Sequence, residues 1–162
     1  KRLAELKEQE IQYKIPEQGI MIETPAAAII SDRLAEMVDF FSIGTNDLTQ
    51  YTMAVDRGNS KVAYLYSVYN PAVIRSIKRI ISAAANENII AGMCGEAAAD
   101  PLLTPLLISF GLKEFSVNAS SILRTRAQIA KWTKAEADKV ADEVMKCATQ
   151  EEVYEILKRY QR

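Results

Sequence analysis

Short apolar runs alternate with longer stretches of helical periodicity along most of the chain. A strand that is covered on both faces forms a continuous apolar run rather than an alternation of apolar and polar residues. Four runs have this character: residues 19–23, 40–44, 89–94 and 114–118. The segments between them are too long for hairpin turns, so the pattern predicts parallel strands joined by helical crossovers.

Helix signals lie before, between and after these runs. Thr24 and Pro25 supply an N-cap and a first-turn proline, which are typical of a helix start. Gly111 follows an apolar helical face and is well placed to end that helix in a left-handed conformation. The predicted helices cover residues 1–13, 25–36, 71 onward, 100–110 and 122–132.

The last part of the chain carries strong local signals. The capping boxes Thr133-x-x-Glu136 and Thr149-x-x-Glu152 each predict the start of a helix. Ordinary amphipathic faces follow them, and these indicate packing against the domain rather than partner binding. By contrast, residues 46–70 are too polar and tyrosine-rich to be regular throughout. Structureless connections of that length are uncommon in compact domains, which hints at function.

Polar residues stand at or just past the carboxyl end of all the predicted strands: Glu23, Asn46 with Asp47, Cys94 with Glu96, and Asn118. Catalytic residues of (β/α)8 barrels gather on this face from several strands, whereas an open sheet concentrates its ligand at one switch point. The pattern therefore favours a barrel, and four strands make half of one. We predict an α/β fold, the C-terminal half of a (β/α)8 barrel plus C-terminal helices, in which residues 1–162 are a partial domain. Open sheet edges favour oligomer formation or edge pairing.

Composition narrows the classes of function. The net charge of −1 argues against broad nucleic-acid binding. No apolar run approaches the roughly 18 residues that suggest a membrane span, so we expect a cytoplasmic protein without membrane insertion. The sequence contains no histidine. Any role of histidine as general base or covalent phosphate carrier must therefore belong to another residue or another polypeptide segment.

Candidate ligands for a metal and an anion follow the first two strands. Glu23 and Asp47 at adjacent strand ends could share Mg²⁺, which takes one or two carboxylates plus phosphate oxygens and water; helix capping is the alternative for a lone carboxylate. Asn46 and the backbone N–H groups after Gly44 could hold phosphate, although Asn-Asp is also a common helix start. Arg57 could clamp a phosphate or a carboxylate, or be a surface residue.

Cys94 lies in the segment GMCGE between two glycines. A free cysteine on a buried strand is usually a small core residue. The flanking glycines favour a functional role, because they allow a ligand to approach the backbone closely and leave the thiol free to donate a proton or attack an electrophile. Glu96 fits either a base beside this thiol or a helix cap.

Three segments carry a resemblance to a known family: GIMIETPAAA, SIGTNDLTQYTMAVDRGN and GMCGEAAAD. In order and spacing they resemble the phosphoenolpyruvate-binding barrel of enzyme I of the bacterial sugar phosphotransferase system, the phosphoenolpyruvate–protein phosphotransferases. The resemblance extends from about residue 19 to the end of the chain. The segments AVDRGN and ASSILR favour enzyme I over the related pyruvate phosphate dikinases and phosphoenolpyruvate synthases.

The resemblance implies a role for each candidate residue. Glu23 and Asp47 would bind magnesium, and Asn46 with the backbone of Asp47 would hold the phosphate. Arg57 would bind phosphoenolpyruvate, and Cys94 would give the proton that converts the enolate to pyruvate. In this family the phosphoryl group passes to a histidine in a separate domain and then to a histidine-containing phosphocarrier protein, as the first step of sugar transport.

The same resemblance implies that parts of the family's active site lie outside residues 1–162. The phospho-accepting histidine and the first half of the barrel are not in this sequence, so we expect the chain alone to release no pyruvate. A noncatalytic module for dimerisation or metabolite sensing is an alternative from another class. A carbon–carbon lyase on a related barrel is a third hypothesis, and it fits the long NDLTQYTMAVDR segment less well.

Overall fold

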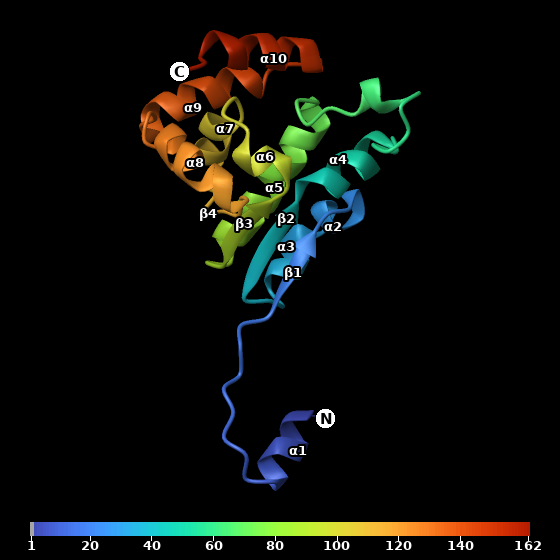
Figure 1. Ribbon diagram of the computed structural model, residues 1–162, viewed down its shortest axis with the longest axis vertical. Coiled ribbons are helices and arrows are strands. Elements are labelled where there is room, and N and C mark those ends of the chain that lie inside the picture. Colours follow the sequence, from blue (N-terminus) through green and yellow to red (C-terminus); the bar gives the residue numbers. More distant parts are fainter. Residues whose placement is uncertain (1) are drawn as a thin grey trace.

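The computed structural model describes residues 2–162 and contains a parallel four-stranded sheet in the order β1-β2-β3-β4 (Figure 1). The strands are β1 Gly19–Ile22, β2 Phe40–Gly44, β3 Ile90–Cys94 and β4 Glu114–Phe115. Because sequential strands are spatial neighbours and all run in one direction, their carboxyl ends meet at one edge. The prediction of an α/β fold with the parallel strands of half a barrel is confirmed.

Helices connect these strands and extend beyond the last one. Between β1 and β3 lie α2 Pro25–Ile29, α3 Ser31–Ala35, α4 Thr45–Met53, the 3₁₀ helix η1 Ala63–Leu65 and α5 Pro71–Asn86. After β3 come α6 Glu96–Ala99, α7 Thr104–Phe110, the 3₁₀ helix η2 Ala119–Ser121, α8 Ile122–Ile129, α9 Lys134–Val144 and α10 Gln150–Arg159. None of the helices found in residues 2–162 is long and apolar enough to cross a membrane.

One face of the sheet is buried against helices and the other is open. Ile22, Ile43 and Met93 are fully buried on the first face, and α5 packs against β2 and β3 there. Each such side chain contributes roughly 1.5–3 kcal/mol by leaving water. On the opposite face, Met21 and Ile90 are 49 % and 54 % exposed. The side chains that are shielded from water thus lie on a single side of this half-barrel sheet.

The helix predicted at residues 25–36 is two helices. Ile30, with φ −99° and ψ 19°, interrupts it between α2 and α3. Arg79 of α5 donates from Nε to the carbonyl oxygens of Ala28 and Ile29, at 3.1 and 3.0 Å. A tertiary contact thus satisfies carbonyls that a continuous helix would have used internally.

Other element boundaries also differ from the prediction. The connection expected from residue 46 begins as the regular helix α4, and only its later part is irregular. The helix expected at residues 100–110 starts at Thr104 after a turn, and the strand expected at 114–118 has two residues. The next helix, α8, was predicted at 122–132 and ends at Ile129. The left-handed helix end at Gly111, with φ 91°, is confirmed.

Both ends of the chain contain the expected helices. The N-terminal helix predicted at 1–13 is shorter, α1 Arg2–Glu8, and residue 1 lies outside the described part. It buries no residue and stands apart from the body at the end of an extended segment (Figure 1). Both predicted capping boxes, at the starts of α9 and α10, are present with their reciprocal bonds.

Candidate active site

The candidate residues converge at the carboxyl edge of the sheet. Glu23 directly follows β1, Asn46 and Asp47 lie in the first turn of α4 after β2, and Cys94 ends β3. Gly44 and Cys94 are directly paired in the register of β2 and β3. The parallel order of the strands therefore brings together residues that are up to 71 positions apart in the sequence, from Glu23 to Cys94.

Two glycines make room for the polar side chains at this edge. A Cβ atom at Gly44 would lie 2.7 Å from Oε2 of Glu23, so the Glu23 carboxylate occupies the space above the Gly44 backbone. A Cβ atom at Gly95 would lie 2.5 Å from Oγ1 of Thr45, and Gly95 also has φ 98°. At both positions a Cβ atom would force a neighbouring side chain to shift, and at Gly95 the backbone conformation also favours glycine.

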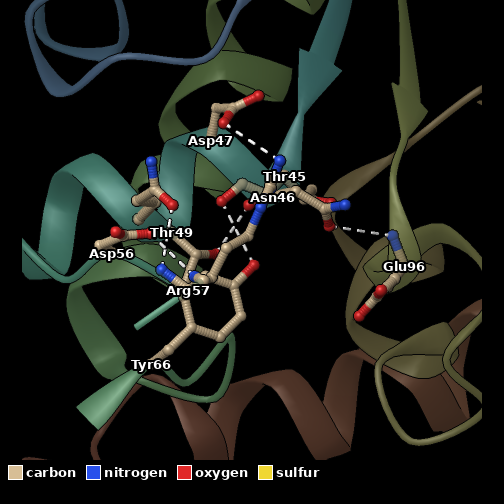
Figure 2. Close-up of polar contacts among 10 residues, drawn as sticks. Thr45, Asn46, Asp47, Thr49, Asp56, Arg57, Tyr66 and Glu96 are labelled. Carbon is tan, nitrogen blue, oxygen red and sulfur yellow. Dashed lines mark hydrogen bonds and ion pairs between the residues drawn. The ribbon is translucent and has the colours of Figure 1, made fainter. Parts of the chain in front are cut away.

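Asn46 is held through both its side chain and its backbone. Its Oδ1 accepts a hydrogen bond from the backbone N–H of Glu96 at 3.2 Å, and its carbonyl oxygen accepts one from the hydroxyl of Tyr66, also at 3.2 Å. Figure 2 shows these contacts reaching Asn46 from opposite sides. Because the amide oxygen is engaged, the NH₂ group remains as the donor that Asn46 offers to a ligand.

Asp47 and Arg57 form an ion pair at the start of α4 (Figure 2). The Nη2 atom of Arg57 lies 3.5 Å from Oδ1 of Asp47, and the two side chains are 44 % and 37 % exposed. The backbone N–H of Arg57 donates to Oε1 of Gln50 at 3.1 Å. A pair this exposed is worth at most about 1 kcal/mol, so either side chain can exchange its partner for a ligand at low cost.

Cys94 is a free, partly exposed thiol on the open face of the sheet. The Ser42 hydroxyl lies 3.8 Å from its sulfur, and the thiol donates to the carbonyl oxygen of Ile43 at 3.6 Å. Oγ1 of Thr45 donates to the Cys94 carbonyl oxygen at 3.0 Å. The sulfur is thus oriented by β2 and accessible from the open side, unlike the thiol of a core cysteine.

A cavity of about 440 Å³ adjoins these residues and is lined in part by Asn46, Glu96, Asp100, Asn118 and Arg124. Asn118 was expected only as a polar strand end; its Oδ1 caps η2 by accepting from the backbone N–H of Ser121 at 2.9 Å. Asp100 and Arg124 were not predicted as candidates. Both lie in segments that support the resemblance, Asp100 at the end of GMCGEAAAD and Arg124 at the end of ASSILR.

The donor chemistry at the edge fits a hard divalent cation. Glu23 and Asp47 offer carboxylate oxygens, which Mg²⁺ prefers, and it needs only one or two of them when phosphate and water complete its coordination. Among residues 2–162, no three Cys, Asp or Glu side chains come together as a metal cluster. The arrangement therefore suits magnesium bound together with a phosphorylated ligand, and it does not suit a closed structural zinc site.

Comparison with known proteins identifies the family of this chain. Residues 1–134 match the family described as the PEP-binding domain of PEP-utilising enzymes. The chain belongs to this family. The matched range includes every candidate residue of the site, whereas α10 and most of α9 lie beyond it.

Two curated relatives of this PEP-binding domain carry the same name. The chain is 54 % identical over 143 residues to the phosphoenolpyruvate-protein phosphotransferase of Geobacillus stearothermophilus. It is 52 % identical over 144 residues to the protein of the same name from Listeria monocytogenes. These matches cover 88 % and 89 % of the chain but 25 % of each relative. The chain thus spans about a quarter of the length of the curated relatives it matches.

Proposed function

We propose that this chain is the C-terminal part of a phosphoenolpyruvate–protein phosphotransferase and contributes one side of its phosphoenolpyruvate site. The observation that carries the proposal is the convergence of two carboxylates, an amide, an arginine and a free thiol at the carboxyl edge of three neighbouring strands. The PEP-binding domain family and the names of the relatives support the same substrate. Residues 1–162 would form a partial barrel that an upstream half completes.

Substrate binding would use the groups that the fold leaves available. Arg57 can turn from Asp47 to the phosphate or carboxylate of the substrate, since their ion pair is exposed and weak. The NH₂ group of Asn46 and the backbone N–H of Asp47 would donate to the phosphate. Glu23 and Asp47 would hold Mg²⁺, which when bound supplies positive charge against the phosphate oxygens.

The reaction would divide between this chain and a histidine outside it. The bond between the phosphorus and the enol oxygen of phosphoenolpyruvate breaks as a bond forms between phosphorus and a histidine nitrogen. The electron pair left on the enolate takes a proton at carbon from the Cys94 thiol, giving pyruvate and a thiolate that regains a proton from water. Arg57 would stabilise the negative charge that develops on the phosphoryl oxygens.

The proposed partners follow from the same chemistry. A phosphohistidine domain would receive the phosphoryl group and pass it to a histidine-containing phosphocarrier protein, in the cytoplasm, at the start of sugar uptake. We propose a homodimer as the working assembly. The name phosphotransferase on the relatives favours this function over a dikinase or a synthase.

A noncatalytic binding module is the second candidate. The half-exposed Met21 and Ile90 on the open face of the sheet, and the two edge strands β1 and β4, favour an assembly role. In that case the polar edge would bind no phosphoenolpyruvate. The two candidates therefore differ in what happens when the missing half of the barrel is supplied.

The decisive experiment supplies that half from a relative. In a hybrid enzyme, this chain replaces the 143-residue segment that it matches in the Geobacillus stearothermophilus phosphotransferase. We expect the hybrid to convert phosphoenolpyruvate to pyruvate, and Arg57→Ala to lower kcat/KM at least about 100-fold because a charge-stabilising group is lost. Arg33→Ala, which removes a surface arginine paired with Glu36, is the matched control and should leave kcat/KM unchanged.

Two results would contradict the proposal. One is a hybrid that folds cooperatively but forms no pyruvate, and the other is equal activity of the Arg57→Ala and Arg33→Ala hybrids. The purified 162-residue chain provides a further check, since we expect it to release no pyruvate on its own.

A further inference from the structure

The segment that carries Arg57 has little regular structure of its own. It connects α4 to α5 over residues 54–70 and contains only the short η1 helix. It leaves α4 through Ala54 in a left-handed conformation, with φ 52°, and through the buried Val55, whose N–H donates to the Gln50 carbonyl oxygen at 3.0 Å. The start of the segment is therefore fixed to α4, and its remainder depends on contacts made further along.

Two tyrosines near the far end of this segment make those contacts. The Tyr66 hydroxyl donates to the backbone carbonyl oxygen of Asn46 at 3.2 Å. The Tyr69 hydroxyl donates to Oδ2 of Asp100 at 2.6 Å, and its ring packs edge-on against Tyr154 with 5.5 Å between centroids. Burial and the Asp100 carboxylate raise the pKa of Tyr69 above its usual range, so this hydroxyl stays protonated as a donor at physiological pH.

The contacts of Arg57 itself are too weak to fix its position. Among residues 2–162 its guanidinium forms one ion pair, with Asp47 at 3.5 Å, in which the Arg57 side chain is 44 % exposed. Its backbone N–H donates one hydrogen bond, to the Gln50 side chain. The Tyr66 bond ends on Asn46, which is also the residue that would bind the phosphate. Through this hydrogen bond, Tyr66 connects residues 54–70, which include Arg57, to the turn of α4 that contains Asn46 (Figure 2).

We infer that Tyr66 is a positioning residue for Arg57. Its hydroxyl holds residues 54–70 against Asn46, so that the guanidinium and the Asn46 amide face one anionic ligand from a fixed separation. Tyr69 supports the same segment through its hydrogen bond to Asp100. The identity of the ligand as phosphoenolpyruvate rests on the proposed function, whereas the ordering of the segment does not.

The expected effect follows from the population of the ordered segment. Without the hydroxyl, Arg57 occupies its binding position for a smaller fraction of the time, and the apparent affinity falls by that fraction. A hydrogen bond of ordinary strength corresponds to roughly a fivefold to tenfold change in population. The bound state is reached less often but is itself unaltered, so KM should rise while kcat stays within about twofold.

Tyr66→Phe is the test variant and Tyr64→Phe is its matched control. Tyr64 lies on η1 in the same segment, is 76 % exposed and makes no hydrogen bond through its side chain to any of residues 2–162. In the 162-residue chain, we expect Tyr66→Phe to raise the hydrogen-exchange rate of the Arg57 amide about fivefold. Tyr64→Phe should leave that rate unchanged. Equal exchange in the two variants would overturn the ordering role.

Kinetics of the hybrid enzyme test the link to Arg57. We expect Tyr66→Phe to raise KM for phosphoenolpyruvate about fivefold to tenfold in the otherwise unchanged hybrid, and to have no further effect once Arg57→Ala is present. Additive losses in such a cycle would show that Tyr66 acts independently of Arg57, and would overturn the inference.

The two proposals fail in different ways. If the folded hybrid makes no pyruvate, the proposed function fails, and amide exchange at Arg57 still decides whether Tyr66 orders the segment. If Arg57→Ala impairs the hybrid but Tyr66→Phe does not, the proposed function stands and the positioning role is wrong.

Discussion

The carboxyl edge of the sheet and the starts of the C-terminal helices differ in the sequence separation of the residues that bond there. At the edge, every bond that orients Cys94 or the Asn46 side chain joins residues 49 to 52 positions apart. At the starts of α9 and α10, the two capping boxes join residues three apart in the sequence. The edge leaves side chains partly exposed and weakly paired, whereas the helix starts satisfy their own backbone groups.

Contacts of the C-terminal residue also connect the end of the chain to the start of α9. Arg162 lies over the Trp132 ring at 4.2 Å and binds the Glu136 carboxylate at 2.7 Å, while Lys131 donates to the Arg162 carbonyl oxygen at 2.8 Å. This region therefore contributes stability, whereas the sheet edge keeps groups free for a ligand. The contrast predicts that substitutions in the two regions change different measured quantities.

The largest expected effect is on the chemistry at the edge. Replacing Cys94 by alanine in the hybrid enzyme should lower pyruvate formation at least about 100-fold, because positioned proton transfer is typically worth 10²–10⁴ in rate. Cys147→Ala is the matched control: this thiol is buried between α9 and α10, and burial raises its pKa. Its loss should reduce the unfolding free energy and leave the rate unchanged. Similar rates for the two variants would remove Cys94 from the mechanism.

A single added methyl group should damage both stability and metal binding. In Gly44→Ala the new Cβ would lie 2.7 Å from Oε2 of Glu23. Overpacking of this kind costs roughly 1–3 kcal/mol, and displacement of the carboxylate should lower magnesium affinity, measured by titrating Mg²⁺ against activity. Gly58→Ala, whose Cβ would meet only the Asp56 carboxylate from 3.2 Å outward, should be nearly neutral. An unchanged magnesium affinity in Gly44→Ala would contradict the role of Glu23 as a ligand.

Removal of a capping box should affect stability alone. Thr149→Ala deletes the side-chain oxygen that accepts from the backbone N–H of Glu152 at the start of α10. The loss of such an N-cap costs about 1 kcal/mol, which corresponds to roughly 2–4 °C in Tm for a chain of this size. Thermal melts would measure it, and KM of the hybrid should not change. A raised KM would mean that α10 communicates with the sheet edge.

The smallest expected effect is a pH dependence of the unfolding free energy that comes from the contact between Arg162 and Glu136. Hydrogen bonds from Arg162, and then from Thr133, lower the pKa of Glu136 from 4.5 to about 2. Because the folded-state pKa is the lower one, the stabilisation is complete above about pH 4.5 and is lost as the pH falls through about 2. Arg162→Gln should flatten the fall in unfolding free energy over this range, and Arg126→Gln, at an exposed position of α8, should not. Identical denaturation curves from pH 5 to pH 2 would contradict this assignment.

The same contrast explains which predictions from sequence succeeded. The capping boxes and the glycine end of α7 depend on neighbouring residues, and all of them are confirmed. The break at Ile30 was missed because Arg79, about 50 positions away, binds the carbonyl oxygens there. The contacts of Tyr66 and Asp100 were missed for the same reason, since no local pattern marks a partner 20 or more positions distant.

The sequence alone determined the class of fold, the parallel pairing of the strands, and the chemical types at the strand ends, because apolar periodicity and residue chemistry are local properties. Tertiary structure decided how those types are used. It placed Glu23 over Gly44, paired Asp47 with Arg57, and set Cys94 on the open face beside Ser42. These arrangements depend on the register of parallel strands and on glycine-sized spaces between them, which only the packed sheet defines.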